Sequence, residues 1–539
     1  MSSEFTRRGF LKGAVAGVTA AGGAVGGAAL PAGAASPKPE QQTGGSDWQK
    51  PPRQTGNGLN LIVIVADTFR ADNLACYGPR WRDQLETPNL DRFAQGSTVF
   101  ADAYAEALPT IPVRRGLYTG RRGIPAHYFP QFDEVQLPGW HPLYHEDVTL
   151  SETLLEAGYT NALFSSVYHQ FKPGRNFHRG FHTWHAIRGL EYDYCGTNPR
   201  RRWDVSDMAS EEHLAKFPWL RDQLSQYKAN RNIWQQQGES VCQLTAQAAM
   251  RWLQEDRAES PFYLHVEFFD PHEPWDPPRR FLEKYLPDAH GPSFIEPPYE
   301  TVPLAEEIKA RMRANYAGAV SCVDHWVGAL LDTVRQFDLL RNSVVVFTSD
   351  HGAMLGERQQ FLKGPDKLRG QVTHLPLLVH VPENPYAGKK VEGFVQHPDI
   401  MPTVLGRLGL KSPARVTGQD FWTPLAAQAR PIHDYVVQSY GWVAAVRTKE
   451  WSYSEIWKPE APQDKFHKTP DAPAAPYAPQ LYHLTSDPRE LTDVAGKYPD
   501  VARQMSAKMK EYIASGEGVT LGGFHGKPSL VVEEGLYSK

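Results

Sequence analysis

Runs of consecutive apolar residues alternate along this chain with segments of helical periodicity. Residues 59–66 read LNLIVIVA and residues 343–348 read SVVVFT. Neither run leaves room for a polar face, which is typical of strands in a parallel sheet covered by helices on both sides. The same pattern predicts further strands at residues 99–104, 160–165, 261–269 and 375–381. It predicts helices at residues 88–95, 150–157, 240–253, 308–337 and 498–513, and a short helical stretch that opens at Thr110.

This alternation predicts an α/β fold in which a mainly parallel central sheet is flanked by helices. After about residue 430 the pattern changes to short strands and a terminal helix, which predicts a smaller C-terminal α+β subdomain. We therefore expect a main domain over residues 58–430 and a subdomain over residues 431–539. Residues 185–235 are rich in Trp, Tyr and Arg without a clear period, and we expect them to form an insertion or lid.

The N-terminal residues have the pattern of an export signal. Residues 6–12 read TRRGFLK and are followed by an Ala/Gly-rich run and then PAGAAS, which predicts a twin-arginine signal peptide over residues 1–35. Residues 36–57, rich in Pro, Gln, Gly and Ser, are expected to be a linker. We expect the twin-arginine export machinery to deliver the protein to the periplasm or outside the cell. Because no other segment has 18 or more apolar residues, no membrane span is expected in the mature form.

Composition narrows the classes of function. Of the 539 residues, 41% are hydrophobic and 22% are charged, as in ordinary globular proteins. The formal net charge of −4 gives no reason to expect nucleic acid as a partner. The four cysteines show no CxxC spacing, so neither a cysteine zinc site nor a disulfide framework is implied, although one or two bridges stay open.

Acidic residues follow two of the predicted buried strands. Asp67 follows residues 59–66, and Asp350 with His351 follows residues 343–348. Ligands of open α/β sheets bind at the carboxyl ends of the strands, so these side chains are expected to converge there. Carboxylate and imidazole ligands suit a divalent cation such as Ca²⁺, Zn²⁺ or Mn²⁺. A single aspartate is more often a cap or turn residue, and it is the joint occurrence of the three that favours a metal site.

Segments spread along the chain resemble, in family order, the motifs of the sulfatase family in the alkaline-phosphatase superfamily. They read IVIVADTFRADNLACYG, TPNLDRFAQGSTVFADAYA, TIPVRRGLYTGR, FFDPHEPWDPP, TSDHGAMLGERQQFLKG and LYHLTSDPRELTDVA. The resemblance implies an alkaline-phosphatase/sulfatase-like fold with its catalytic domain over residues 58–430. It also implies a hydrolase that acts on sulfate or phosphate esters of a small molecule or glycan.

The resemblance also implies a metal site and catalytic residues. Asp67, Asp350 and His351 match metal ligands, and the oxygen of Thr110 is expected to complete the set. Thr68 stands where many relatives have a second acidic ligand.

The residues that match catalytic groups are spread over four segments. Arg114 matches the arginine that supports the nucleophile, His272 a histidine at the ester or leaving oxygen, and Lys363 a lysine that binds anionic oxygens. His169 resembles the histidine of a Lys-x-His pair, in which Val167 replaces the lysine.

Thr110 occupies the position at which the family's sulfatases oxidise a cysteine or serine to formylglycine. Oxidation of threonine would give a ketone, and Val113 replaces the usual small polar residue, so we do not expect formylglycine here. We expect Thr110 to be an unmodified nucleophile that a metal activates. The alternatives are a phosphodiesterase or phosphoryl transferase of the same fold, and a non-catalytic ligand-binding relative in which Thr110 merely caps a helix. A second metal on Asp270, His272 and His374 is a further alternative.

Overall fold

The computed structural model describes residues 56–125, 139–172, 174–195, 202–257, 261–288, 290–426, 431–457 and 477–516. The expected signal peptide and nearly all of the expected linker therefore lie outside the described residues. Among the helices that are described, none combines the length and the apolar character that a membrane crossing requires.

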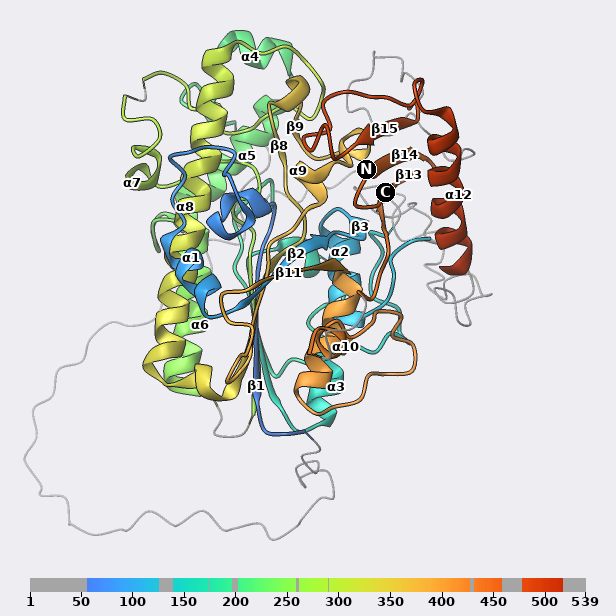
Figure 1. Ribbon diagram of the computed structural model, residues 1–539. Helices are drawn as coiled ribbons and strands as arrows, with labels where there is room; N and C mark the ends of the chain where they lie inside the picture. The colour runs from blue at the N-terminus through green and yellow to red at the C-terminus, as the bar shows by residue number, and fades with distance from the viewer. Residues whose placement is uncertain are drawn as a thin grey trace, which may run out of the picture. The chain divides into compact units, whose positions relative to one another are not determined.

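In the described part of the chain, eight strands form a central sheet in the order β11-β2-β10-β7-β1-β6-β4-β5. Figure 1 shows this sheet with β1, β2 and β11 labelled. They are β1 (Asn60–Ala66), β2 (Thr98–Tyr104), β4 (Thr160–Ser165), β5 (Thr183–Ala186), β6 (Phe262–Phe268), β7 (Ser343–Ser349), β10 (Leu377–His380) and β11 (Lys390–Gln396). β1 lies between β6 and β7 and is parallel to both. Among these strands β10 alone is antiparallel to its neighbours, so the predicted mainly parallel sheet is confirmed.

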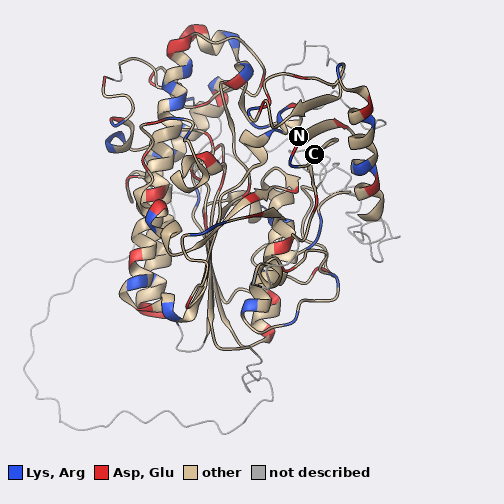
Figure 2. Ribbon diagram, viewed as in Figure 1, with Lys and Arg blue, Asp and Glu red and all other residues tan. Residues whose placement is uncertain are grey.

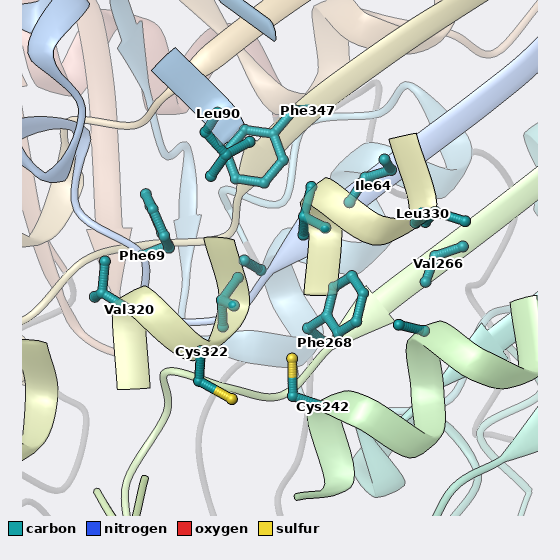
Figure 3. Packing of buried hydrophobic residues seen from close by; sticks show 14 of the residues in the cluster. Ile64, Phe69, Leu90, Cys242, Val266, Phe268, Val320, Cys322, Leu330 and Phe347 are labelled. Atoms are coloured by element: carbon teal, nitrogen blue, oxygen red, sulfur yellow. The ribbon is translucent and has the colours of Figure 1, made fainter. Parts of the chain in front are cut away.

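Helices cover both faces of this sheet, which is why β1 after Asn60 and residues 344–347 of β7 are entirely apolar. Ile62 and Ile64 of β1 face one core, which includes residues of α1 (Pro88–Gln95), α6 (Val241–Arg251) and α8 (Glu306–Gln336). Figure 3 shows part of this core, in which side chains from three strands meet those of α6 and α8. Leu61 and Val63 face a second core, to which α2 (Thr110–Thr119), α3 (Leu150–Glu156) and α10 (His397–Arg407) contribute. Alternate residues of β1 are therefore buried on opposite faces.

A smaller sheet follows in the C-terminal part of the chain, and its described strands run in the order β15-β14-β13-β12-β3. They are β3 (Ala107–Leu108), β12 (Val436–Tyr440), β13 (Val443–Arg447), β14 (Trp451–Ile456) and β15 (Gln480–His483). α12 (Pro499–Gly516) covers this sheet, with Met505 and Met509 packed in the same cluster as Leu481. The smaller C-terminal sheet domain is thus confirmed. Its edge strand β3 comes from early in the chain and leads directly into α2.

The region expected to be an unperiodic insertion has regular structure over much of its length. After β5 it forms α4 (Glu211–Lys216) and α5 (Trp219–Trp234). Leu220, Leu224 and Tyr227 of α5 are spaced by four and three residues and are buried, so a helical period was present. The polar residues between them, of which only Arg221 and Asp222 are charged, hid that period. The same cluster contains Phe269, which places these helices behind one wall of the candidate site.

Short elements complete the described structure. They include α7 (Arg279–Leu282), α9 (Gly370–Thr373), α11 (Trp422–Ala426), β8 (Met354–Leu355), β9 (Phe361–Leu362) and several 3-10 turns, among them η4 (Tyr168–Gln170). Figure 2 shows charged residues mainly on helices and loops, whereas the strands around β1 are almost entirely uncharged. A charged side chain on those strands is therefore an exception that requires a specific reason.

Candidate active site

Two aspartates lie side by side because the strands that carry them are neighbours in register. Ala66 of β1 pairs with Ser349 of β7, so Asp67 and Asp350 follow at the same edge of the sheet. Together with His351 they are fully buried, and one ligand atom from each lies within 4.8 Å of the others. Within the described residues this is the one group of three or more His, Cys, Asp or Glu side chains close enough to share an ion.

Thr68 links the two carboxylates. Its backbone N–H donates to Asp350 Oδ1 at 2.9 Å, and its hydroxyl donates to Asp67 Oδ1 at 2.8 Å. Its φ of +62° is rare for a β-branched residue, and its carbonyl accepts a hydrogen bond from the hydroxyl of Tyr316 at 2.8 Å. The strained conformation is therefore held by contacts on both sides, which is common at functional sites.

Arg114 connects the carboxylate cluster to the start of α2. Its Nε donates to Glu267 Oε2 at 2.8 Å, and its Nη1 donates to the carbonyl oxygen of Thr110 at 3.1 Å. The same Nη1 contacts Asp350 Oδ2 and lies 3.1 Å from Asp67 Oδ2, although the latter contact lacks hydrogen-bond geometry. One buried guanidinium therefore touches a residue of β6, the residues that follow β1 and β7, and the first residue of α2.

The charges of this cluster do not balance. The carboxylates of Asp67, Asp350 and Glu267 face the single guanidinium of Arg114, all of them fully buried. If all four are ionised, their sum is −2, which is the charge that a divalent cation neutralises. Burial first, and then the neighbouring Asp350, raises the pKa of Asp67 well above its ordinary value. A proton on Asp67 would thus relieve part of the repulsion that a cation would remove.

The donor atoms also fit a divalent cation. Oδ2 of Asp67 and Nε2 of His351 are buried and have no hydrogen-bond partner. Burial lowers the pKa of His351 to about 4, which keeps the imidazole neutral, the form that binds metals. Burial alone would raise the pKa of Asp350, but His351, Arg114 and the N–H of Thr68 bring it below its ordinary value. Two carboxylates and one neutral imidazole form a mixed oxygen and nitrogen ligand set.

Thr110 is the first residue of α2 and is buried, and Pro109 occupies the N-cap position. The interpretation of Thr110 as the capping residue is therefore not supported. Its carbonyl shares Nη1 of Arg114 with both aspartates, so Thr110 lies at the carboxyl-terminal edge of the sheet beside the cluster.

Lys363 and His272 form a second group in the site. Lys363 Nζ lies 2.7 Å from His272 Nε2 and 2.8 Å from Glu273 Oε1, and the hydroxyl of Tyr299 also donates to Glu273. Burial opposes the charge on Lys363, but Glu273 and then Asp67 raise its pKa, which keeps it an ammonium. Burial lowers the pKa of His272, with Glu273 opposing the change.

His169 lies on η4 at one side of this group. Its Nε2 is 2.9 Å from Glu191 Oε2, and its ring centroid is 6.0 Å from that of Phe269. Phe269 in turn stacks on His272 with centroids 4.2 Å apart. Burial would raise the pKa of Glu191, but His169 lowers it to about 2, so this carboxylate is ionised. His169 is thus near the Lys363 group but apart from the three candidate ligands.

The structure separates the residues that were considered for a second metal. His374 Nε2 contacts the carbonyl of Ala101 at 2.8 Å, and its ring stacks on Tyr104 with centroids 5.0 Å apart. No group that includes His374 with Asp270 and His272 is close enough to hold an ion among the described residues. The two-metal alternative is therefore wrong for this part of the chain.

Sequence reasoning missed Glu267, Glu273 and Glu191. The run PFYLHVEFF predicts a strand, yet it carries Tyr263, His265 and Glu267 at alternate positions. A charged residue inside a strand buried on both faces is a signal that could have been noticed.

Comparison with known proteins agrees with this geometry. An α/β sheet with buried carboxylates, an arginine and a lysine at its carboxyl edge is the arrangement of an ester hydrolase of the alkaline-phosphatase superfamily. A family model described as Sulfatase matches residues 59–410, and the chain belongs to the sulfatase family.

The individual relatives have a low sequence identity to this chain, but the similarity extends over most of its length. The iduronate 2-sulfatase of Mus musculus is 24% identical over 439 residues, which cover 70% of this chain and 74% of that protein. An arylsulfatase of Clostridium perfringens is 23% identical over 469 residues, which cover 81% of this chain and 90% of that protein. The solved structure of the phosphonate monoester hydrolase of Agrobacterium radiobacter superposes with a TM-score of 0.60 at 21% identity. The match covers 85% of this chain and 96% of that chain. This structural likeness confirms the fold, and the family defines the chain as a hydrolase of sulfate or phosphate esters.

Proposed function

We propose that this protein is an exported, metal-dependent ester hydrolase in which unmodified Thr110 supplies the nucleophile. The observation that carries the proposal is the position of Arg114, whose Nη1 contacts the carbonyl of Thr110 and both buried aspartates. Asp67, Asp350, His351 and the side-chain oxygen of Thr110 would hold Ca²⁺, Zn²⁺ or Mn²⁺. When bound, such a cation lowers the pKa of a hydroxyl and polarises an ester oxygen.

The residues of the chain supply the rest of the first step. Thr110 loses its hydroxyl proton to solvent, and its oxygen attacks the phosphorus or sulfur atom of the ester. Because Thr110 opens α2, the positive end of the helix dipole favours the negative charge that collects there. Arg114 Nη2 is buried and has no hydrogen-bond partner, so it is available to an anionic oxygen of the substrate.

The leaving oxygen receives its proton from the Lys363 and His272 pair. Lys363 is charged and can only donate, so the neutral ring of His272 accepts at Nε2 and orients the ammonium. Lys363 then acts as the general acid, while His169, fixed by Glu191, aligns the leaving group from the other side of Phe269.

A threonine nucleophile favours phosphate esters over sulfate esters. A formylglycine hydrate has a second hydroxyl that expels sulfate, whereas the ester on Thr110 must be hydrolysed by water attacking the central atom. If an alcohol takes the place of that water, the same site is a phosphoryl transferase, and a diester substrate makes it a phosphodiesterase. These outcomes share the first step and differ in the acceptor or in the second substituent on phosphorus.

The test is a substrate screen on the mature protein after metal removal and after separate reloading with Ca²⁺, Zn²⁺ or Mn²⁺. Nitrophenyl phosphate, bis-nitrophenyl phosphate, a nitrophenyl phosphonate and nitrophenyl sulfate are compared, together with the intact mass of the protein. We expect metal-dependent turnover of at least one phosphorus ester and an unmodified mass at Thr110. Binding of metal and of a phosphate or sulfate anion without turnover of any ester would support the non-catalytic alternative instead.

A further inference from the structure

A row of polar side chains crosses the buried face of β6. Tyr263, His265 and Glu267 occupy alternate positions and therefore point to the same face of the strand. The hydroxyl of Tyr263 lies 2.6 Å from Nδ1 of His265, and Nε2 of His265 lies 2.8 Å from Oε1 of Glu267. All three are buried. A polar row in such a strand is costly unless each member is hydrogen-bonded, and here each is.

Glu267 is the end of this row and has donors on every side. The hydroxyl of Tyr118 at 3.1 Å and Nε2 of Gln170 at 2.8 Å share Oε1 with His265, while Nε of Arg114 at 2.8 Å binds Oε2. Burial would raise the pKa of Glu267, but Arg114 and then His265 lower it to about 2, so the carboxylate is ionised. An anion with four donors cannot shift without leaving some of them unpaired.

We propose that Glu267 is a positioning residue that fixes the guanidinium of Arg114 between the sheet interior and the metal carboxylates. With Nε on Glu267 and Nη1 on Asp350 and Asp67, the plane of the guanidinium is determined, and Nη2 is left for the substrate. The ionised Glu267 also neutralises part of the positive charge of Arg114, so Arg114 attracts the two aspartates less strongly. That leaves their oxygens available to a cation rather than to the arginine.

This inference rests on the proposed function, because its kinetic readouts need a metal-dependent ester hydrolase. The first test is Glu267→Gln, which keeps the shape of the side chain and removes its charge. We expect kcat to fall about 10- to 100-fold, with KM little changed, because Arg114 acts on charge that develops in the transition state. We also expect the affinity for Mn²⁺ or Zn²⁺, measured by titration of the metal-free protein, to fall by a similar factor.

A matched control is Asp324→Asn, which removes the charge of another buried carboxylate. Asp324 accepts hydrogen bonds from the backbone N–H and side chain of Asn89 and from the N–H of Leu90, away from Arg114. We expect this control to lose thermal stability while kcat and metal affinity stay near those of the wild type. A merely structural role of Glu267 would produce the same result in Glu267→Gln and would overturn the proposal.

A double-mutant cycle with Arg114→Lys identifies the route of the effect. If Glu267 acts through Arg114, Glu267→Gln should cost little further activity or metal affinity in the Arg114→Lys background. Equal losses in both backgrounds would contradict the proposal. Should Glu267→Gln not fold, Glu267→Asp retracts the carboxylate from Nε and keeps the charge, and wild-type values in that variant would also overturn it.

Failure of the proposed function would be recognised separately. A wild-type protein without metal binding or turnover would remove that function and leave the orientation of Arg114 to be examined. A crystal structure of Glu267→Gln, or of Glu267→Asp, then decides the matter. We expect Arg114 to rotate toward Asp67 and Asp350, and an unchanged Arg114 would refute the positioning role.

Discussion

Nζ of Lys363 lies 2.7 Å from Nε2 of His272, and this contact determines which ring nitrogen of His272 carries the proton. An ammonium group has no lone pair, so Nε2 of His272 must accept. The ring proton is then on Nδ1, which lies 2.5 Å from the carbonyl oxygen of Glu273. Because burial lowers the pKa of His272, the ring stays neutral at physiological pH. Lys363, rather than His272, is therefore the group with a proton to give.

Replacement of Lys363 should affect substrates according to their leaving group. For Lys363→Ala we expect kcat/KM to fall about 100- to 10,000-fold for alkyl esters, whose alkoxide must be protonated as it leaves. Nitrophenyl esters need no such proton and should lose much less. The check is a series of esters with leaving groups of graded pKa. Lys367→Ala is the control, since Lys367 donates to the carbonyl of Tyr299 and is not bonded to His272. A uniform loss across the series would assign Lys363 to charge stabilisation only.

Replacement of Thr110 separates catalysis from folding. Thr110→Ala should abolish turnover, and Thr110→Ser should retain part of it, because serine keeps the hydroxyl at the start of α2. The unfolding temperature of both variants should stay close to that of the wild type, since the backbone contact to Arg114 is unchanged. The measurements are steady-state kinetics and thermal unfolding on the same samples. Wild-type activity in Thr110→Ala would remove Thr110 from the role of nucleophile.

Neutralising Asp67 should act in opposite directions on the metal-free and metal-loaded protein. Its raised pKa means that the ionised carboxylate destabilises the metal-free fold at neutral pH. Asp67→Asn should therefore preserve or raise the unfolding temperature without metal. With metal, the variant should lose the stabilisation of the wild type, which is about 2.7 kcal/mol when free metal is 100 times its Kd.

The comparison is thermal unfolding of both proteins with and without Mn²⁺ or Zn²⁺. Asp72→Asn serves as the control, since Asp72 pairs with Arg70 at 2.6 Å and is outside the candidate ligand group. A lower stability of metal-free Asp67→Asn, or an undiminished response to metal, would contradict this assignment.

Glu106 should make stability depend on pH. Burial raises its pKa to about 7 although its carboxylate accepts the N–H groups of Gly123 at 2.7 Å and Ile124 at 3.2 Å. Between the ordinary pKa of 4.5 and this value, the folded state keeps a proton that the unfolded state loses. The free energy of unfolding therefore falls as pH rises through that window, by an amount on the order of 3 kcal/mol.

Glu106→Gln should remove this part of the pH dependence, because its amide does not titrate. Urea unfolding of both proteins at about pH 5, near the lower limit of the window, and at about pH 8, above its upper limit, is the measurement. Parallel pH profiles of the wild type and the variant would show that Glu106 does not titrate in this range.

Export should depend on the arginine pair of the predicted signal. Replacement of Arg7 and Arg8 by lysine should leave the precursor in the cytoplasm of a host with a twin-arginine system. The wild-type protein should appear outside the cytoplasm with an N-terminus near Ala34 or Ala35, as measured by intact mass. Lys12→Ala, which leaves the arginine pair in place, should not prevent export. Normal export of the double lysine variant would refute the twin-arginine route.

Much of the fold could be predicted from local pattern. The strands expected at residues 59–66 and 343–348 are β1 and β7, shifted by one residue at one end of each. Burial on both faces favours an apolar residue at nearly every position of such a strand, so its sequence pattern is easy to recognise. The helix α5 was not predicted, because the buried positions Leu220, Leu224 and Tyr227 are separated by many polar residues.

The candidate site was predictable only where its residues stand next to a recognisable element. Asp67 and Asp350 could be named because each directly follows a buried strand. Glu273 could not, since nothing near it in the chain indicates that Lys363, 90 residues away, donates to it. The neutral state of His272 likewise follows from a neighbour distant in sequence.

The sequence by itself determined the buried strands of the sheet, its helical layers and the motifs that carry the chemistry. These features depend on residues that are close together in the chain, so a local pattern is enough to predict them. Only the tertiary structure decided which carboxylates Arg114 binds, since Glu267 and Asp350 are 153 and 236 positions away from it. Which charges meet in a buried site, and therefore which protons they hold, depends on the order of strands in the sheet. That order is set by the packing of the whole chain.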